Sequence, residues 1–174
     1  GTFGSGSTSS GAHKVLDGNV AIGYYALKST GANPQTGTVA IGGFALTALT
    51  DGLKNTAVGY QAGLELTIGD RNTMLGWGAM DDSLAGLQND DNVFIGFNAG
   101  GGTWVSASCS KNTAIGSYVM DDAMNGANDN TAVGYQALSE LTTADKNIAI
   151  GSGSLAAQTT GGDNIAIGYN AMVT

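Results

Sequence analysis

The chain has little of several residue types on which common functions depend. Its 174 residues include one cysteine, one histidine, one proline and six lysine and arginine residues in all. A single thiol, Cys109, excludes an intramolecular disulfide, and with a single imidazole, His13, the chain lacks the second histidine and the flanking carboxylate pair that a ligand or base would need. With so few cations, the chain lacks the basic patch that neutralises nucleic-acid phosphates. We therefore expect no nucleic-acid binding.

Long apolar runs are missing as well. The longest apolar-leaning run, Val39 to Leu49, is too short to cross a bilayer and contains glycine and threonine, so we expect no membrane insertion. Fourteen acidic against six basic residues give a net charge of −8, and 29 glycines stand among 42% hydrophobic residues. Such a chain is too apolar for disorder, and its glycines lack the collagen period. Short strands between turns fit this composition, so we expect an all-β fold.

One nine-residue stretch, Asn130–Leu138, is repeated along the chain with starts 17 to 20 residues apart. Its nine copies begin at Asn19, Thr38, Asn55, Asn72, Asn92, Asn112, Asn130, Asn147 and Asn164. Units of this length bury their apolar face only against neighbouring units, which predicts a solenoid. We predict a single parallel β-solenoid (a β-roll) of about nine coils over residues 19–174. Residues 1–18 are expected to be a flexible lead-in or an incomplete first coil, and the whole a segment of a longer protein.

Position 5 of the motif is glycine in every copy. These glycines are Gly23, Gly42, Gly59, Gly76, Gly96, Gly116, Gly134, Gly151 and Gly168. Their invariance within the chain indicates either a positive φ or an approach too close for a Cβ atom. We expect them to form the corner at which each strand bends.

Position 1 is asparagine in eight copies, with Thr38 as the exception, and an aspartate precedes it by one or two residues in most copies. Asparagine and aspartate favour turns, and amides stacked coil on coil predict a ladder of side-chain hydrogen bonds. The segment after position 9 is too short for a stable helix. A single helical turn and a second short strand both fit it.

Strand side chains alternate between two faces, and here both faces are apolar. Position 4 is always Ile, Val or Leu, so we expect the face that carries positions 2 and 4 to be buried. Position 3 points the other way and is alanine in seven copies, with Met74 and Phe94 in the other two. A sheet that is apolar on both sides needs cover on both sides. We expect identical chains to supply it, as a homotrimer; the alternative is a flattened monomeric coil.

The motif also resembles a known family of repeats. The stretches Asn19–Gly23, Asn147–Gly151 and Asn164–Gly168 resemble the repeats of YadA-like head domains in trimeric autotransporter adhesins. The fuller stretches Asn55–Ala62 and Asn130–Ala137 are similar to repeats of bacteriophage tail fibres. The resemblance implies a left-handed, trimeric β-roll in a virion tail fibre or on the bacterial outer surface, where it mediates attachment to a host or a surface.

No catalytic motif is found in the sequence, so we expect no enzyme activity and no cofactor. The acidic pairs Asp81–Asp82, Asp90–Asp91 and Asp121–Asp122 are expected to be solvated turns. Glycan hydrolysis by paired carboxylates is a weaker alternative. Stacked aspartates also suit Ca²⁺, whose oxygen ligands would relieve their repulsion. The candidate metal ligands are Asp90, Asp91 and Asp129.

Aromatic residues follow the corner glycine in six copies and are expected to form a stacked ladder. Trp104, in an inserted stretch, and Trp77 are the candidates for receptor contact, with a surface glycan or a host receptor as the partner. Thr56, Thr73, Thr113 and Thr131 share position 2, as in ice-binding solenoids, but valine and isoleucine interrupt them. The expected function is therefore a structural and adhesive segment of an extracellular or virion fibre, with glycan binding or cleavage and ice binding as alternatives.

Overall fold

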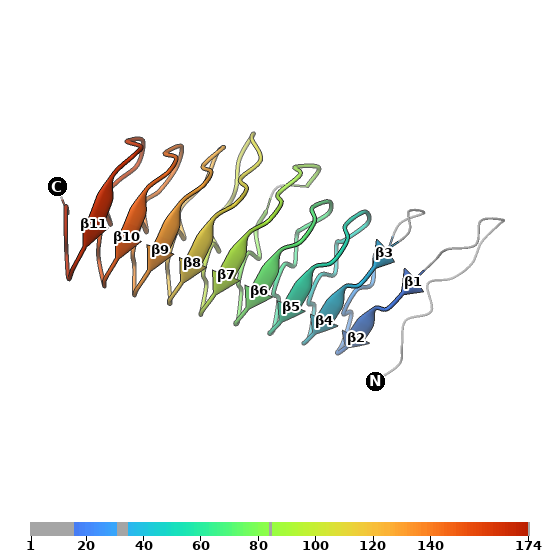
Figure 1. Cartoon of the computed structure of the whole chain (residues 1–174). Helices are drawn as coiled ribbons and strands as arrows, with labels where there is room; N and C mark the ends of the chain where they lie inside the picture. The colour runs from blue at the N-terminus through green and yellow to red at the C-terminus, as the bar shows by residue number, and fades with distance from the viewer. Residues whose placement is uncertain (1–15, 31–34, 84, 174) are drawn as a thin grey trace.

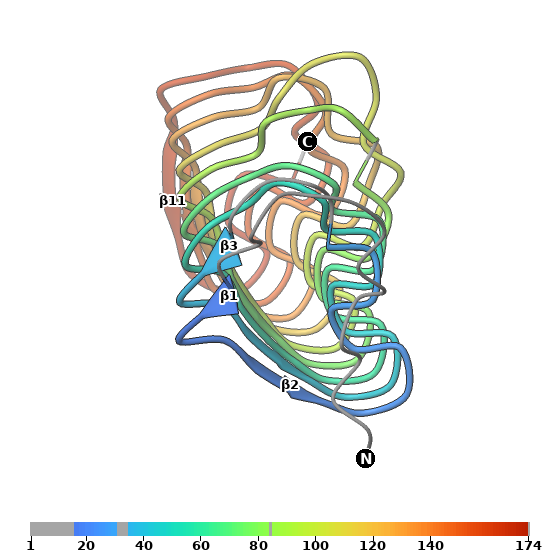
Figure 2. The ribbon, with the colours of Figure 1, turned by 90° about the vertical axis from the view of Figure 1, so that its right-hand side faces the viewer.

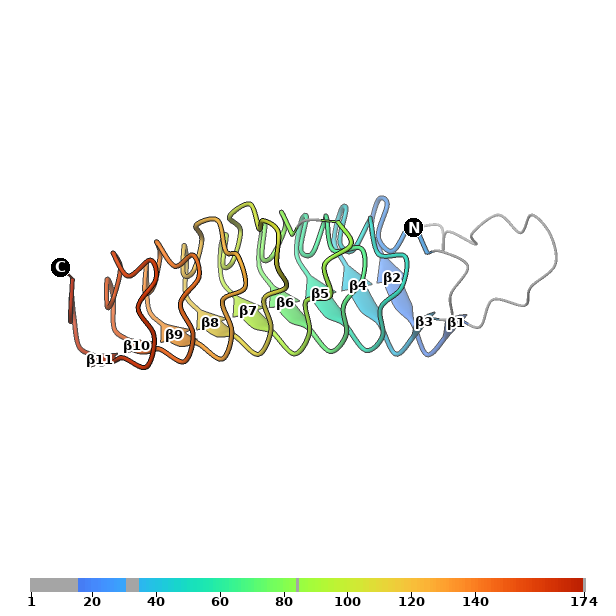
Figure 3. The same cartoon turned by 90° about the horizontal axis from the view of Figure 1, so that it is seen from above.

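The computed structural model describes residues 16–30, 35–83 and 85–173. Its strands are β1 (Leu16–Asp17), β2 (Val20–Ile22), β3 (Gln35–Thr36), β4 (Val39–Ile41), β5 (Thr56–Val58), β6 (Thr73–Leu75), β7 (Val93–Ile95), β8 (Thr113–Ile115), β9 (Thr131–Val133), β10 (Ile148–Ile150) and β11 (Ile165–Ile167). No helix is assigned within these ranges. The strands lie side by side along a rod, with β2 near one end of it and β11 at the other (Figures 1 and 3).

Nine strands form one parallel sheet in the order β11-β10-β9-β8-β7-β6-β5-β4-β2. Each motif position pairs with the same position of the next copy, as Thr113 does with Thr131 and Ala114 with Ala132. Viewed along the rod, the coils stack on one another (Figure 2). The predicted parallel β-solenoid is confirmed. β1 and β3 pair in a separate two-stranded sheet, whereas residues 1–15 of the predicted lead-in, His13 included, lie outside the described residues.

The structure reverses the predicted inside and outside of the long sheet. Position 3 faces the interior: Ala114, Met74 and Phe94 are fully buried. Positions 2 and 4 face outward, and Ile22 and Leu75 are 55% and 45% exposed. The prediction that positions 2 and 4 are buried was wrong. A coil of 17 to 20 residues is narrow, so the face that carries mostly alanine is the one that turns inward.

The half-coil opposite the sheet is neither a helical turn nor a regular strand. It is a compact turn in which positions 7 and 9 both have left-handed backbone, as at Tyr118 (φ 55°) and Met120 (φ 48°). This conformation is unusual for side chains of that size. It directs position 9 into the interior, where Met120 and Leu138 are fully buried against the alanines of the sheet.

Large side chains at position 3 are accommodated by glycine at position 9. A Cβ atom added at Gly63 would lie 2.8 Å from the sulfur of Met74, and one added at Gly100 would lie 2.5 Å from ring carbons of Phe94. A large side chain at position 3 is therefore compensated by the missing side chain at position 9, so the total side-chain volume inside the coil changes little.

The corner glycines need both properties that the sequence indicated. At Gly116, φ is +143°, and an added Cβ would lie 2.4 Å from the carbonyl oxygen of Gly134 in the next coil. Gly168 has the same backbone shape, with φ +135°, but the nearest atom to its added Cβ is the Cβ of Ala171 at 3.9 Å. Gly116 thus needs glycine both for its positive φ and for its close approach to the next coil, whereas Gly168 needs it for the positive φ alone.

The predicted asparagine ladder is confirmed, and it lies inside the coil stack. The Oδ1 atom of Asn112 accepts from the backbone N–H and the Nδ2 atom of Asn130, both at 3.1 Å. Its own Nδ2 donates to the Ala127 carbonyl at 2.8 Å and to Asn92 Oδ1 at 3.3 Å. The same pattern runs from Asn55 to Asn164. Each buried amide therefore joins two coils.

Candidate functional site

The outer face of the long sheet is a continuous apolar surface. Position 2 supplies Val20, Val39, Thr56, Thr73, Val93, Thr113, Thr131, Ile148 and Ile165, and position 4 supplies Ile22, Ile41, Val58, Leu75, Ile95, Ile115, Val133, Ile150 and Ile167. None of these 18 side chains is buried. Exposed apolar patches of this extent mark interaction surfaces in soluble proteins. We call this surface the outer sheet face.

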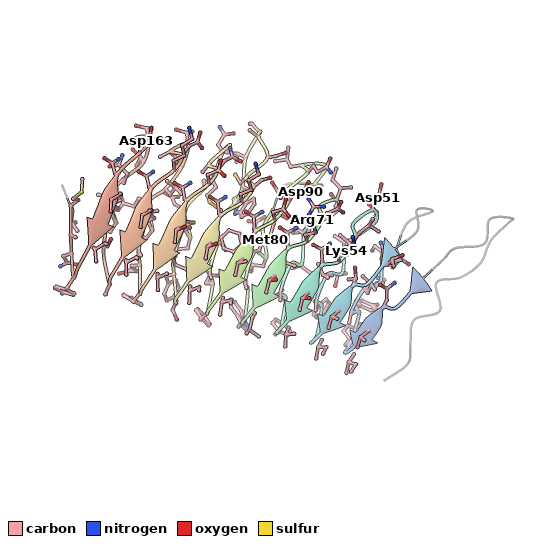
Figure 4. The ribbon with its side chains drawn as sticks, viewed as in Figure 1. Asp51, Lys54, Arg71, Met80, Asp90 and Asp163 are labelled. Carbon is pink, nitrogen blue, oxygen red and sulfur yellow. The ribbon has the colours of Figure 1, made fainter. Side chains whose placement is uncertain are left out.

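A row of charges borders the outer sheet face on the side where the strands begin. The residue before each motif asparagine is exposed and left-handed, and it is charged in seven successive coils. These residues are Lys54, Arg71, Asp91, Lys111, Asp129, Lys146 and Asp163. Figure 4 shows Lys54, Arg71, Asp90 and Asp163 along this edge of the rod. Because the signs mostly alternate, neighbouring coils attract one another along the row.

Arg71 forms ion pairs with Asp90 and Asp91, two of the three predicted Ca²⁺ ligands. Its Nε and Nη2 atoms donate to the two carboxylate oxygens of Asp91 at 2.6 and 2.9 Å. The carboxylates of Asp70 and Asp90 lie 3.4 and 3.6 Å from the same guanidinium. The hydrogen bond from Arg71 is the main reason why the pKa of Asp91 lies below its usual value.

The three predicted metal ligands are not brought together. Asp90 and Asp91 lie in one turn, whereas Asp129 belongs to a turn two coils further on, about 10 Å along the rod. Within residues 16–30, 35–83 and 85–173, no group of three or more His, Cys, Asp or Glu side chains is placed to hold a metal ion. Several turn aspartates instead join coils: Asp90 Oδ1 accepts from the Asp70 N–H, and Asp145 Oδ1 accepts from the Asn128 N–H.

An aromatic ladder follows the opposite border of the outer sheet face. Successive rings are in contact through Tyr24, Tyr25, Phe44, Tyr60, Trp77, Phe97, Tyr118 and Tyr135. Trp77 is 44% exposed but lies between Tyr60, at a centroid distance of 6.3 Å, and Phe97, at 4.9 Å, both nearly parallel to it. Its two faces are covered, so Trp77 offers a partner its edge.

Trp104 is not a surface residue. It is fully buried, its ring meets Phe94 edge to face at a centroid distance of 5.6 Å, and its Nε1 donates to the Gly100 carbonyl at 3.0 Å. The prediction that Trp104 contacts a receptor was wrong, because the inserted stretch folds its indole into the interior. Cys109 is buried as well, and burial raises the pKa of its thiol.

The other two acidic pairs lie on the surface of the half-coils. Asp121 and Asp122 line a shallow hollow of about 320 Å³, together with Gln136, Ser139 and Glu140. Burial raises the pKa of Asp121, and the neighbouring charge of Asp122 adds to the effect. This hollow places carboxylates, an amide and a hydroxyl within reach of one small polar ligand.

Asp81 gives the molecule a pH-dependent stability. Burial raises its pKa to about 6, with smaller contributions from Asp82 and Glu65. An unfolded aspartate titrates near pH 3.9, so the stability that protonated Asp81 supplies is present below about pH 4 and is lost as pH rises through about 6. We expect Asp81→Asn to stabilise the fold at pH 7 by about 1 kcal/mol, since the carboxyl is partly exposed, and to change little at pH 4.

Thermal unfolding of the wild type and of Asp81→Asn at both pH values tests this expectation. Asp163→Asn is the control, because the Asp163 side chain is exposed and is not among the groups that raise the pKa of Asp81. A stability difference that is the same at pH 4 and pH 7 would contradict the assignment to Asp81.

Comparisons with protein-family models, with curated proteins and with solved structures find no match to this chain. Over the described residues, no helix is long and apolar enough to span a membrane. A functional proposal therefore rests on the surfaces described above.

Proposed function

We propose that this chain is a structural and adhesive segment of an extracellular or virion fibre, built from three identical chains. The observation that carries the proposal is the outer sheet face, on which 14 of the 18 side chains are apolar and the other four are threonines, over the whole length of the nine-stranded sheet. The resemblance of the motif to tail-fibre and adhesin-head repeats supports the same function. In this proposal the chain supplies attachment and has no catalytic role.

A second copy is the partner that the outer sheet face suits best. Nine coils that each advance about 4.8 Å give a face roughly 40 Å long. With a width of about 20 Å between the charge row and the aromatic ladder, it offers on the order of 800 Å² per chain, which is the size of a stable protein interface. In a trimer with three-fold symmetry, each chain buries its outer sheet face against the other two. All three chains then run in the same direction, as a fibre requires.

Solution mass by light scattering tests the assembly. We expect the wild type to have the mass of three chains, and Ile115→Glu to have the mass of one, because Ile115 lies on the outer sheet face and is 39% exposed. Ala157→Glu is the matched control, since Ala157 is exposed on the half-coil. A wild type that is monomeric at micromolar concentration would contradict the proposal.

A second candidate function is ice binding, and one observation favours it. Position 2 lies on the exposed face, so Thr56, Thr73, Thr113 and Thr131 point outward, among short apolar side chains. A flat, repetitive array of this kind is the surface that ice-binding solenoids present. Thermal hysteresis in a monomeric wild type, lost in Thr113→Lys, would support ice binding. A trimer without thermal hysteresis would leave the fibre proposal in place.

A further inference from the structure

We propose that the aromatic ladder contains a binding site for one ring of a neutral surface glycan, at the coil where the ladder is interrupted. This inference rests on the adhesive function proposed above and names its ligand class. The interruption lies in the coil of β10, where positions 6 and 7 are Ser152 and Gly153. Tyr135 precedes it and Tyr169 follows it, each at position 6 of a neighbouring coil.

The interruption sets this coil apart from the others along the ladder. The coil of β4 has Gly43 at position 6 and the coil of β8 has Ser117, but each carries a ring at position 7, namely Phe44 or Tyr118. Ser152 and Gly153 supply no ring at either position. The tyrosines on both sides are well exposed, Tyr135 at 52% and Tyr169 at 80%.

The spacing of the coils gives the interruption the size of one sugar ring. Gly153 N–H donates to the Tyr135 carbonyl and Asn170 N–H to the Ser152 carbonyl, both at 2.9 Å, so the backbone stacks regularly through this region. Tyr135 and Tyr169 are therefore two coil heights apart, about 10 Å. A ring between them needs a contact of about 3.5 to 4 Å on each side. The ring of Tyr135 meets Tyr118 edge to face, at an interplanar angle of 85°, and the two coil heights leave room for one pyranose ring between Tyr135 and Tyr169.

Polar groups lie at the interruption and on the preceding coil. Ser152 provides a hydroxyl, and the side chain of Asn170 lies where a Cβ atom at Gly153 would be. Gln136, which follows Tyr135 directly, belongs to the hollow of about 320 Å³ that also contains Ser139 and Glu140. Aromatic faces beside amide, hydroxyl and carboxylate groups recognise the apolar face and the hydroxyls of a sugar together.

Charge selects the kind of glycan. The hollow next to Tyr135 carries three carboxylates, from Asp121, Asp122 and Glu140, and the chain has a net charge of −8. Carboxylates accept hydrogen bonds from sugar hydroxyls but repel sulfated and sialylated chains. The site is therefore expected to take neutral hexose or N-acetylhexosamine oligomers.

Two serine variants provide a matched test. Ser152→Tyr adds the missing ring and closes the interruption, whereas Ser117→Tyr makes the same change at position 6 of the coil of β8, where Tyr118 already continues the ladder. Position 6 holds tyrosine at Tyr24, Tyr60, Tyr135 and Tyr169, so both variants are compatible with the fold. Thermal unfolding and light scattering confirm folding and assembly of each protein before binding is measured.

Binding is measured by calorimetry with cellohexaose, maltohexaose and chitohexaose, and with a heparin hexasaccharide as the anionic probe. We expect at least one neutral probe to bind the wild type and Ser117→Tyr alike, and to bind Ser152→Tyr and Tyr135→Ala at least tenfold more weakly. Equal affinities for the two serine variants, binding of heparin alone, or no binding at all would overturn the inference. None of these outcomes alters the light-scattering mass, so the fibre proposal is judged separately.

Discussion

Replacing Gly116 by alanine is expected to destabilise the fold by at least about 4 kcal/mol. The backbone at Gly116 has φ +143°, a region that costs a residue with a Cβ about 1–3 kcal/mol. The new methyl group would also lie 2.4 Å from the carbonyl oxygen of Gly134. That oxygen belongs to the backbone of the next coil, so relief requires the two coils to separate at the corner. Urea unfolding of the wild type and the variant measures the loss.

Gly168→Ala is the matched control for this prediction. Its φ is +135°, but the nearest atom to the added methyl is the Cβ of Ala171, at 3.9 Å. Only the cost of the positive φ applies there, so the expected loss is about 1–3 kcal/mol. If both glycine variants lose the same stability, the close approach between coils is not what requires glycine at position 5.

The second large effect is expected at the centre of the asparagine ladder. Asn112→Ala removes hydrogen bonds to Asn92, to Asn130 and to the Ala127 carbonyl. It leaves the Asn130 N–H and the Ala127 carbonyl buried without these partners, and each such group costs about 1–3 kcal/mol. The expected loss is about 3–5 kcal/mol, measured by urea unfolding. Asn164→Ala should lose about 1 kcal/mol, because Asn164 is only partly buried.

The reciprocal change separates hydrogen bonding from packing. Thr38 occupies the place of a ladder asparagine, and its buried Oγ1 has no hydrogen-bond partner. An amide at this position has Asn19 Oδ1 on one side and the N–H of Asn55 on the other, by analogy with the regular coils. Thr38→Asn should therefore stabilise the protein by about 1 kcal/mol. Loss of stability in this variant would contradict the view that the ladder depends on its amide hydrogen bonds.

Periodicity alone predicted the features that repeat in every coil. A glycine nine times at position 5 specified the corner, and an asparagine eight times at position 1 specified a stacked amide ladder. In both cases the repeat itself was the evidence, because stacked coils require the same backbone conformation and the same hydrogen bonds at equivalent positions. The in-register pairing of the nine strands in the long sheet has the same origin.

The alternation of side chains did not reveal which face of the sheet lies inside. Both faces are apolar, and the expectation that Ile and Val are buried favoured the wrong one. Residue volume carries the missing information: Ala57 is buried within the narrow coil, whereas Ile41 and Ile115 face outward. Larger side chains enter position 3 only where glycine stands at position 9, as at Gly63 and Gly100. Alanine at a repeated strand position indicates the inward face when the coil is short.

Trp104 illustrates a second limit of the sequence. An inserted tryptophan suggested surface contact, but the neighbouring Gly100 and the bulky Phe94 mark the place where the interior accommodates extra volume. The left-handed backbone at Leu138 and Met120 gave no signal either, since neither residue type prefers it. The interruption at Ser152, in contrast, can be found from the sequence by comparing positions 6 and 7 of all nine copies, because this is the copy with no aromatic residue at either position.

The stacking of coils on their neighbours has a mechanical consequence. Bonds such as Thr113 N–H to the Asn130 carbonyl connect one coil to the next along the rod, so a pull on the two ends loads them in tension instead of in shear. Few bonds resist at any moment, and a terminal coil detaches before its neighbour is affected. A chain pulled at its ends should lengthen at low force in regular steps of one coil, roughly 60 Å each for 17 extended residues. A rod that unfolds one coil at a time dissipates the work of a pulling force while the remaining coils stay folded.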